Sequence, residues 1–478
     1  MKRAGILCPI SCLPGKQGIG DFGKDAYQFC DLLAKAKVKV WQILPLNPLA
    51  YGNSPYQPYS SFAGDEIYLD CDAFIKEKLL KRREIQSYRK GLKSVNYDSV
   101  RPFKEELYRL AYSRFIPDED YRSFCERNSW LEGYAVYRVF KKQNGDKEWL
   151  EWEEEYRNYP EISFSLVPFE KELSYHKFLQ YYFYKQWMSL KAYANKKGLM
   201  IIGDMPIYVG MDSADVWLNK ENFLLEEDGS PAFVAGVPPD YFSKFGQRWG
   251  NPIYNWEYLQ THDFDFWIQR LSYACQLYDV LRIDHFRGFD TYWKIPSDEP
   301  TAIIGTWEEA PGYALFDTLF AQHPECHILA EDLGDLRDEV YQLRDRYHFK
   351  GMYVYEFHHH VEYDFSKVVA YTGTHDNDTL IGWYNSLEKD EKKDINKQLK
   401  PYQEKSIAKK AIHYCMDLES ETVIIPVWDL LELTKKSRFN VPGTIGSPNW
   451  EWRMADYDAL KIQLKDFKKM IVETQREE

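Results

Sequence analysis

Eight short apolar runs recur along this 478-residue chain, and helical patterns separate several of them. Short apolar runs bounded by polar or glycine residues suit strands that are buried on both faces of a parallel sheet. Residues 22–36 and 407–416 carry apolar side chains at helical spacing. Eight strands alternating with helices predict an α/β protein, a (β/α)8 TIM barrel. The predicted strands cover residues 4–9, 38–44, 200–204, 280–284, 327–331, 351–357, 368–372 and 422–427.

Three of these runs lead into an acidic residue. Asp284 ends the run at 280–284, Glu331 ends the run at 327–331, and Asp376 follows the run at 368–372. Active sites of such barrels lie at the carboxyl ends of the strands, so the three acids are expected on one rim. A single acid after a strand is more often the cap of the next helix. Three recurrences beside Arg or His neighbours favour a catalytic function instead.

The acids suit cleavage of a glycosidic bond, which needs one carboxylic acid and one carboxylate. Arg282 lies two residues before Asp284, on the same strand face, and is expected to keep that carboxylate ionised. An ordinary buried ion pair is the alternative for Arg282. Glu331 follows an apolar run, and partial desolvation would raise its pKa toward that of a general acid. Asp204, at the end of the run at 200–204, fits hydroxyl binding and turn capping equally well.

Two connections between the predicted strands are long enough to need structure of their own. Residues 50–198, after the second strand, are largely helical in pattern, charged and rich in Tyr and Trp, and are expected to form an inserted subdomain. Residues 206–263, after the third strand, form a second insertion with an irregular loop of Gly, Pro and aromatic residues. Long loops of this kind are often lids or binding loops. Residues 1–478 are expected to form one catalytic barrel that carries both insertions.

Composition restricts the partners. A net charge of −13 and a pI near 5.5 argue against nucleic acid or an anionic membrane surface. Aromatic residues make up 17% of the chain, and core packing explains most of them. Tyr56 and Trp249, however, lie in hydrophilic loops rich in Gly and Pro, where an aromatic face suits the C–H face of a sugar ring.

Neither a metal nor a cofactor is predicted. The eight cysteines are scattered, without a Cys-x-x-Cys pair or zinc-like spacing, and no glycine loop of the phosphate-binding type precedes a helix. The three histidines at 358–360 would alternate between the faces of a strand and could not all converge on a metal. The first residues resemble a signal peptide only superficially, because the apolar run is short and breaks at Pro9. A cytoplasmic protein is expected; a plastid location would follow if a transit peptide had been removed.

Six motifs spread over nearly the whole chain complete the pattern. They are Arg282-Ile-Asp-His-Phe-Arg-Gly-Phe, Leu329-Ala-Glu-Asp-Leu-Gly, Thr374-His-Asp-Asn, Gly203-Asp-Met-Pro-Ile-Tyr, Gly236-Val-Pro-Pro-Asp-Tyr-Phe and Asn440-Val-Pro-Gly-Thr. Together they resemble the motifs of the amylomaltases, the 4-α-glucanotransferases of glycoside hydrolase family 77 in the α-amylase clan.

The resemblance implies a retaining transfer of an α-1,4-glucan segment to the 4-hydroxyl of another glucan or glucose, without a cofactor. The substrates would be maltooligosaccharides, amylose or other α-1,4-glucans. Asp284 would be the nucleophile, Glu331 the acid/base and Asp376 the transition-state stabiliser. The sugar at the scissile bond would contact Tyr56, Asp204, Arg282 and His375. A mobile acceptor-side loop would contribute Tyr241, Phe242 and Trp249.

Two alternatives remain at the level of sequence. An α-glucan hydrolase of the same clan would use the same acids, and its products from maltotriose would be only glucose and maltose rather than a ladder of longer oligosaccharides. A glucan-binding protein with a dead site would give no turnover, although the three acids are intact. The oligomeric state does not follow from the sequence.

Overall fold

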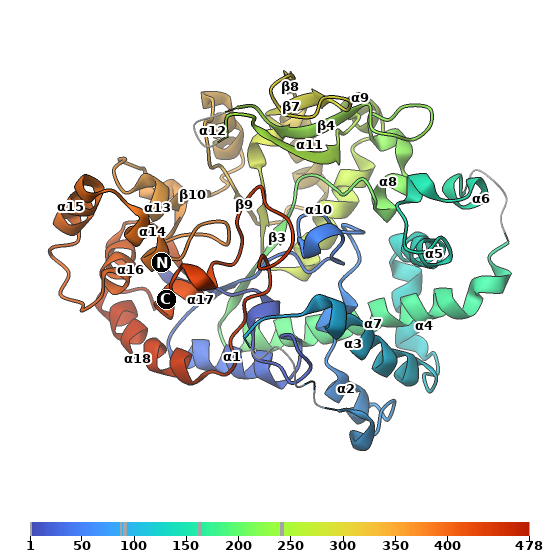
Figure 1. The fold of residues 1–478 in the computed structure, drawn as a ribbon, viewed down its shortest axis with the longest axis horizontal. Helices are drawn as coiled ribbons and strands as arrows, with labels where there is room; N and C mark the ends of the chain where they lie inside the picture. The colour runs from blue at the N-terminus through green and yellow to red at the C-terminus, as the bar shows by residue number, and fades with distance from the viewer. Residues whose placement is uncertain (1, 87, 89–92, 161–164, 240–242, 478) are drawn as a thin grey trace.

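The computed structural model describes residues 2–86, 88, 93–160, 165–239 and 243–477. At its centre, eight parallel strands form a closed barrel (Figure 1). Each strand lies within or next to one of the eight predicted runs, so the predicted (β/α)8 barrel is confirmed. In barrel order the strands are β1 (Arg3–Leu7), β2 (Val40–Gln42), β3 (Met200–Met205), β6 (Val280–Ile283), β9 (Ile328–Ala330), β10 (Gly351–Val354), β11 (Val368–Tyr371) and β12 (Thr422–Pro426).

The sheet closes at two places that join distant parts of the chain. The first and last strands pair in register from Arg3 opposite Thr422 to Leu7 opposite Pro426. Between β9 and β10 the pairing is shorter: the amide of Ala330 donates to the carbonyl of Lys350 at 2.9 Å. Gly5 lies between β2 and β12, where a Cβ atom would come within 2.9 Å of side-chain atoms on both neighbouring strands. Glycine therefore permits the close approach of three strands there.

Helices surround the barrel and complete its core. The predicted helices at 22–36 and 407–416 are confirmed as α1 (Lys24–Lys35) and α16 (Ile407–Asp417), and both bury one apolar face. The other helices that follow barrel strands or pack around them are α10 (Asp265–Leu277), α11 (Gly312–Gln322), α12 (Asp338–Arg346), α13 (Tyr355–His358), α14 (Leu380–Ser386), α15 (Lys389–Gln398), α17 (Val427–Leu430) and α18 (Asp458–Glu473).

The connection between β2 and β3 is mainly helical and lies to one side of the barrel (Figure 1). Its aromatic residues pack against one another: the ring of Phe178 lies 4.9 Å from Phe115, 5.4 Å from Tyr112 and 5.9 Å from Phe74. Many aromatics of this segment thus pack together in a core that is continuous with that of the barrel. Its helices are α2 (Cys71–Lys76), α3 (Tyr97–Tyr112), α4 (Glu119–Arg127), α5 (Trp130–Gln143), α6 (Glu154–Arg157) and α7 (Glu170–Lys196), the last of which leads into β3.

A second, antiparallel sheet lies above the barrel in Figure 1 and was not foreseen from the sequence. Its strand order is β5 (Gln247–Pro252), β4 (Phe233–Val237), β7 (Thr291–Pro296) and β8 (Thr306–Glu309). The expectation of an irregular loop is therefore wrong for much of 233–252, because β4 and β5 pair across residues 238–246. Two short helices of the same connection, α8 (Ala214–Leu218) and α9 (Trp256–Thr261), flank the sheet strands in sequence.

The histidines at 358–360 are not on a strand, contrary to the expectation from the sequence. Pairing between β10 and β11 ends at Val354 opposite Tyr371, and the chain then turns into α13. Only His358 belongs to this short helix; the next two histidines lie in a turn. The argument from alternating strand faces therefore does not apply to them.

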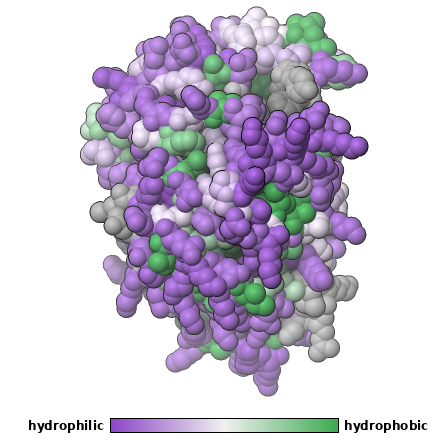
Figure 2. Space-filling model, turned by 90° about the vertical axis from the view of Figure 1, so that its left-hand side faces the viewer, coloured by the Kyte–Doolittle hydropathy of each residue, from purple (hydrophilic) through white to green (hydrophobic). Residues whose placement is uncertain are grey.

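The protein surface is mainly hydrophilic on the face drawn in Figure 2, where hydrophobic residues form small separate groups. Throughout the described ranges, no helix is both long and apolar enough to cross a membrane. All eight cysteines are free thiols, and six of them are buried.

Candidate active site

Asp284 and Glu331 lie on the same rim of the barrel because they follow neighbouring strands. β6 and β9 pair up to Ile283 opposite Ala330, and each acid is the next residue. The backbone continues this pairing, since the amide of Glu331 donates to the carbonyl of Ile283 at 3.0 Å and the amide of Phe286 donates to the carbonyl of Glu331 at 3.0 Å. The predicted convergence of these two acids is thus fixed by backbone hydrogen bonds.

Arg282 connects Asp284 to a second, more deeply buried acid. Its Nη1 donates to both carboxylate oxygens of Asp204, at 2.7 and 2.8 Å, and its Nη2 donates to Oδ1 of Asp284 at 3.0 Å. The hydroxyl of Tyr56 donates to Oδ2 of Asp204 at 2.7 Å. The Asp204 side chain is fully buried, whereas that of Asp284 is 29% exposed. The guanidinium therefore links the barrel interior to a carboxylate that is accessible at the rim.

The two rim acids titrate as a coupled pair. Burial raises the pKa of Asp284 to about 8; Arg282 acts in the opposite direction, and the charge of Glu331 raises the pKa further. Burial also raises the pKa of Glu331 above its ordinary value, against the influence of Arg282 and of two backbone amides. Arg282 lowers the pKa of Asp284, which is the direction expected from the sequence, but burial has the larger effect.

Glu331 is oriented by backbone N–H groups. The amide of His285 donates to its Oε2 at 2.7 Å, and the amide of Leu333 donates to its Oε1 at 3.1 Å. His285 adopts a left-handed conformation, with φ of 50°, which is uncommon for a non-glycine residue. Sequence reasoning did not single out His285, although it directly follows Asp284 in the quoted motif. Its backbone turn aims an N–H group at the neighbouring acid.

Asp376 lies in the loop after β11, as predicted. Hydrogen bonds fix both its side chain and its backbone. Its Oδ1 accepts a hydrogen bond from Nδ2 of Asn440 at 2.6 Å, and its carbonyl accepts one from Nη2 of Arg438 at 2.7 Å. Nε2 of His375 lies 3.4 Å from the other carboxylate oxygen. Burial lowers the pKa of His375, so its imidazole is neutral near pH 7. The carboxylate of Asp376 is 45% exposed, which leaves it accessible at the rim.

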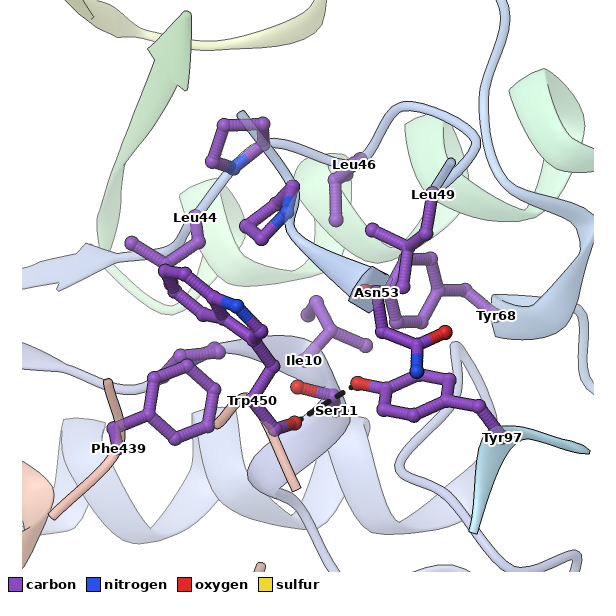
Figure 3. A pocket seen from close by; sticks show the side chains of 13 residues that line it. Ile10, Ser11, Leu44, Leu46, Leu49, Asn53, Tyr68, Tyr97, Phe439 and Trp450 are labelled. Carbon is purple, nitrogen blue, oxygen red and sulfur yellow. Dashed lines mark hydrogen bonds between the residues drawn. The ribbon is translucent and has the colours of Figure 1, made fainter. Parts of the chain in front are cut away.

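Three aromatic side chains, Tyr56, His375 and Trp450, pack together between Asp204 and Asp376. The Tyr56 and His375 rings lie nearly parallel, with centroids 5.1 Å apart and planes at 11°, and Trp450 packs against both at 5.9 and 6.0 Å. Figure 3 shows Trp450 beside Phe439, with its carbonyl accepting a hydrogen bond from Tyr97 at 2.9 Å. The cavity in this view is about 10 Å³, which leaves room for at most one water molecule. Trp450 lines this cavity and is therefore closely packed on that side.

Trp249 also reaches the site, but from a strand. It lies in β5, so the expected loop position is wrong, and its ring meets the His285 ring edge-on at 4.8 Å. Gln57 fixes this strand by donating from Nε2 to the carbonyl of Trp249 at 3.2 Å. Tyr241 and Phe242, which were expected nearby, lie outside the described residues.

The structure brings the remaining predicted site residues into one continuous set of contacts. The set runs from Asp284 through Arg282, Asp204, Tyr56 and His375 to Asp376, and Glu331 joins it through the backbone after Asp284. Asn440 and Trp450 belong to it as well, although sequence reasoning gave them no place in the site. Asn440 opened one of the quoted motifs, whereas Trp450 was one aromatic among many. Over the described ranges, no group of three His, Cys, Asp or Glu side chains is arranged to hold a metal ion.

Comparison with known proteins agrees with this geometry. The sequence profile of a family described as 4-alpha-glucanotransferase matches residues 8–459. A 4-alpha-glucanotransferase of Aquifex aeolicus is 40% identical over 97% of this chain and 98% of its own length. A chloroplastic/amyloplastic 4-alpha-glucanotransferase of Solanum tuberosum is 36% identical over 98% of this chain and 86% of its own length.

A solved structure shows the same arrangement of the whole chain. The amylomaltase of Streptococcus agalactiae, solved in complex with acarbose, superimposes with a TM-score of 0.94 at 36% identity and covers both chains completely. The match extends over the barrel, the helical connection and the second sheet alike. With the family profile and the relatives covering nearly all of its length, this chain belongs to the 4-alpha-glucanotransferase family, the amylomaltases of glycoside hydrolase family 77.

Proposed function

We propose that this enzyme cleaves an α-1,4 bond in a maltooligosaccharide, amylose or another α-1,4-glucan and passes the released segment to the 4-hydroxyl of a second glucan or of glucose. The observation that carries the proposal is the unbroken set of contacts from Asp284 through Arg282, Asp204 and Tyr56 to His375. The complex of the similar amylomaltase with acarbose, a pseudo-oligosaccharide, supports an oligosaccharide substrate.

Asp284 is the proposed nucleophile. Its Oδ1 accepts the hydrogen bond from Arg282, and its Oδ2 receives no hydrogen bond from any described residue, which leaves that oxygen available to attack C1 of the sugar. As the new bond to C1 forms, the bond from C1 to the leaving 4-oxygen breaks, and Glu331 donates its proton to that oxygen. The sugar is then held covalently on Asp284.

The contacts of the two acids fit this division of roles. The charged guanidinium of Arg282 lies 3.0 Å from Asp284 and favours its anion, whereas Glu331 accepts hydrogen bonds from two neutral amides. We propose that Glu331 carries the proton and Asp284 the negative charge when the bond is cleaved. In the second step Glu331 takes the proton of the acceptor 4-hydroxyl, whose oxygen attacks C1 and frees Asp284. Two inversions at C1 give net retention.

The remaining contacts suit binding of the sugar at the scissile bond. Asp376 presents a carboxylate oxygen that can stabilise the positive charge developing at C1. Tyr56 and His375 offer a stacked wall with neutral polar groups, and Asp204 and Arg282 hold the nucleophile in place. Each of these side chains has a supporting partner, which favours a preorganised site.

Transfer rather than hydrolysis requires that water be kept from the covalent intermediate. Trp249, together with Tyr241 and Phe242, is proposed to bind the acceptor sugar and to exclude water. The contact between Trp249 and His285, the residue after the nucleophile, supports this position for Trp249.

The two long connections, 50–198 and 206–263, are proposed to act as inserted subdomains beside the site, the second on the acceptor side. The proposed compartment is the cytoplasm, because eight free thiols suit a reducing environment. A plastid is the alternative compartment, and the name of the Solanum tuberosum relative gives that location for that protein.

The test is the product profile from maltotriose. A transferase gives glucose together with a ladder of longer oligosaccharides, and the number of reducing ends stays nearly constant. Production of only glucose and maltose, with a matching rise in reducing ends, would identify a hydrolase. Absence of turnover would mean that the site only binds glucans.

A further inference from the structure

An exposed apolar patch on the second sheet combines Trp307 of the edge strand β8 with residues just before β8 and just before β5. It consists of Phe245, Ile303, Ile304 and Trp307, which are 50, 50, 55 and 39% exposed, and we call it the Trp307 patch. Trp307 packs against the half-buried Trp293, with ring centroids 5.2 Å apart. Contiguous exposed apolar surface is costly in water and usually marks a binding site.

Backbone contacts make the patch a single surface rather than four scattered residues. Nε1 of Trp293 donates to the carbonyl of Ala302 at 3.0 Å, and the amide of Ala302 donates to the carbonyl of Phe245 at 3.1 Å. These bonds join the segment before β8 to the end of the connection between β4 and β5. The two segments that carry the patch residues therefore lie side by side.

The patch is continuous with the catalytic rim through Arg287. The guanidinium carbon of Arg287 lies 3.8 Å from the centroid of the Trp307 ring, and Arg287 follows Asp284 by three residues. The same side chain donates to the carbonyl of Asp335, four residues after Glu331. Trp307 thus lies beside the loops that carry both the proposed nucleophile and the proposed acid/base.

The second sheet extends from the site to the patch. One edge strand, β5, carries Trp249 beside His285, and the other edge strand, β8, carries Trp307. Three strand spacings separate these edges, about 14 Å, a distance that a few linked glucose residues would span. A glucan leaving the cleaved bond along the Glu331 side would therefore meet an aromatic ring at the far edge.

The groups around the patch suit a neutral polyhydroxylated chain. Aromatic rings pack against the C–H faces of glucose, while hydroxyl groups need both donors and acceptors. Groups of both kinds lie close to Trp307, since the guanidinium of Arg287 packs on its ring and Glu309, two residues later in β8, has an exposed carboxylate. We propose that the Trp307 patch is a remote subsite that binds the acceptor-side glucan beyond the sugars at the cleaved bond, and so gives the enzyme a preference for long chains. This inference rests on the proposed function.

The test compares a long substrate with a short one in the full-length enzyme. For Trp307→Ala, the ratio of kcat/KM for amylose to kcat/KM for maltotriose should fall roughly threefold to tenfold, mainly through KM for amylose, as expected for loss of one aromatic contact. Trp307→Phe should retain most of the preference. The control is Ile462→Ser on α18, at the opposite end of the molecule, where an apolar residue that is 64% exposed is replaced; its ratio should not change.

A second variant, Ile304→Ser, removes apolar surface from the patch without touching an aromatic ring or Arg287 and should lower the same ratio in the same direction. An unchanged ratio in both patch variants would overturn the inference. So would loss of a dimer in sedimentation velocity without a change in the ratio, because the patch would then be an interface between copies. Parent enzyme that makes the oligosaccharide ladder from maltotriose keeps the proposed function valid in either case.

Discussion

Nη1 of Arg282 donates hydrogen bonds to both carboxylate oxygens of Asp204, at 2.7 and 2.8 Å. Both side chains are almost completely buried in the barrel. Both of these hydrogen bonds come from Nη1, so Nη2 can donate to the proposed nucleophile Asp284. Asp204 therefore influences the reaction indirectly, because it orients the Arg282 guanidinium that contacts Asp284.

Removing this anchor should cost stability as well as activity. Asp204→Ala leaves a buried guanidinium with only the partly exposed Asp284 as a partner, and we expect a loss of about 3 kcal/mol in the free energy of unfolding. The measurement is the melting temperature by calorimetry or circular dichroism. Asp394→Ala, at an exposed position on α15, is the control. Equal melting temperatures for the two variants would contradict a structural role for the Arg282 pair.

The raised pKa of Asp284 has a consequence for stability. Between the ordinary pKa of an aspartate and about 8, the folded protein keeps a proton that the unfolded chain has lost, so this carboxyl lowers stability increasingly as pH rises through that window. Asp284→Asn removes the titration. The melting temperature of the variant relative to the parent should therefore increase from about pH 5 to about pH 8.

The same variant should lose transfer activity by more than about a hundredfold, because an amide is a poor nucleophile. Asp394→Asn, an exposed substitution of the same kind, should shift neither property. A stability difference that stays flat with pH would mean that Asp284 is not the group with the raised pKa.

Glu331→Gln should separate the two steps of the reaction. A donor with an activated leaving group no longer needs the acid, whereas release of the glycosyl-enzyme still needs the base. A covalent adduct one glycosyl unit heavier than the protein should accumulate and be visible by intact-protein mass spectrometry. Stoichiometric release of the leaving group with only unmodified protein in the spectrum would refute the dual role.

Trp249→Ala should change the partitioning of the glycosyl-enzyme between a sugar acceptor and water. Its effect on the rate of bond cleavage should be smaller. Loss of the ring should weaken acceptor binding by on the order of 1 kcal/mol. It should also open the space beside His285 to water. We expect more reducing ends formed per oligosaccharide redistributed from maltotriose, and a smaller effect for Trp249→Phe. An unchanged ratio with a large fall in turnover would assign Trp249 to donor cleavage instead.

The eight barrel strands could be predicted because parallel strands buried on both faces are continuous apolar runs, and runs such as Val280–Ile283 need no partner to be recognised. Their carboxyl ends then located Asp284 and Glu331 on one rim. The second sheet escaped prediction because its strands lack that signal: β5 reads Gln-Arg-Trp-Gly-Asn-Pro, and β8 is largely exposed. Such strands exist through their pairing with distant neighbours, which no local pattern reports.

The support of the site was equally invisible in the sequence. Asn440 reaches Asp376 from 64 residues away, and Trp450 packs on Tyr56 from the same late segment of the chain. Both contacts depend on how the chain after β12 folds back over the barrel. The direction in which Arg282 shifts the pKa of Asp284 could be predicted, but the larger and opposite effect of burial could not, because the sequence does not show how deeply the carboxyl is buried.

The pairing of β1 with β12 means that the barrel can close only after nearly the whole chain has been synthesised. The edge of β1 that Thr422 will cover is made about 420 residues earlier, and at ordinary translation rates it waits roughly 20 to 80 seconds for its partner. Until then the nascent barrel has an open, apolar seam, and Asp376 lacks the Asn440 contact that arrives later still. A complete site therefore requires the segment that carries Asn440, which is among the last parts of the chain to be made.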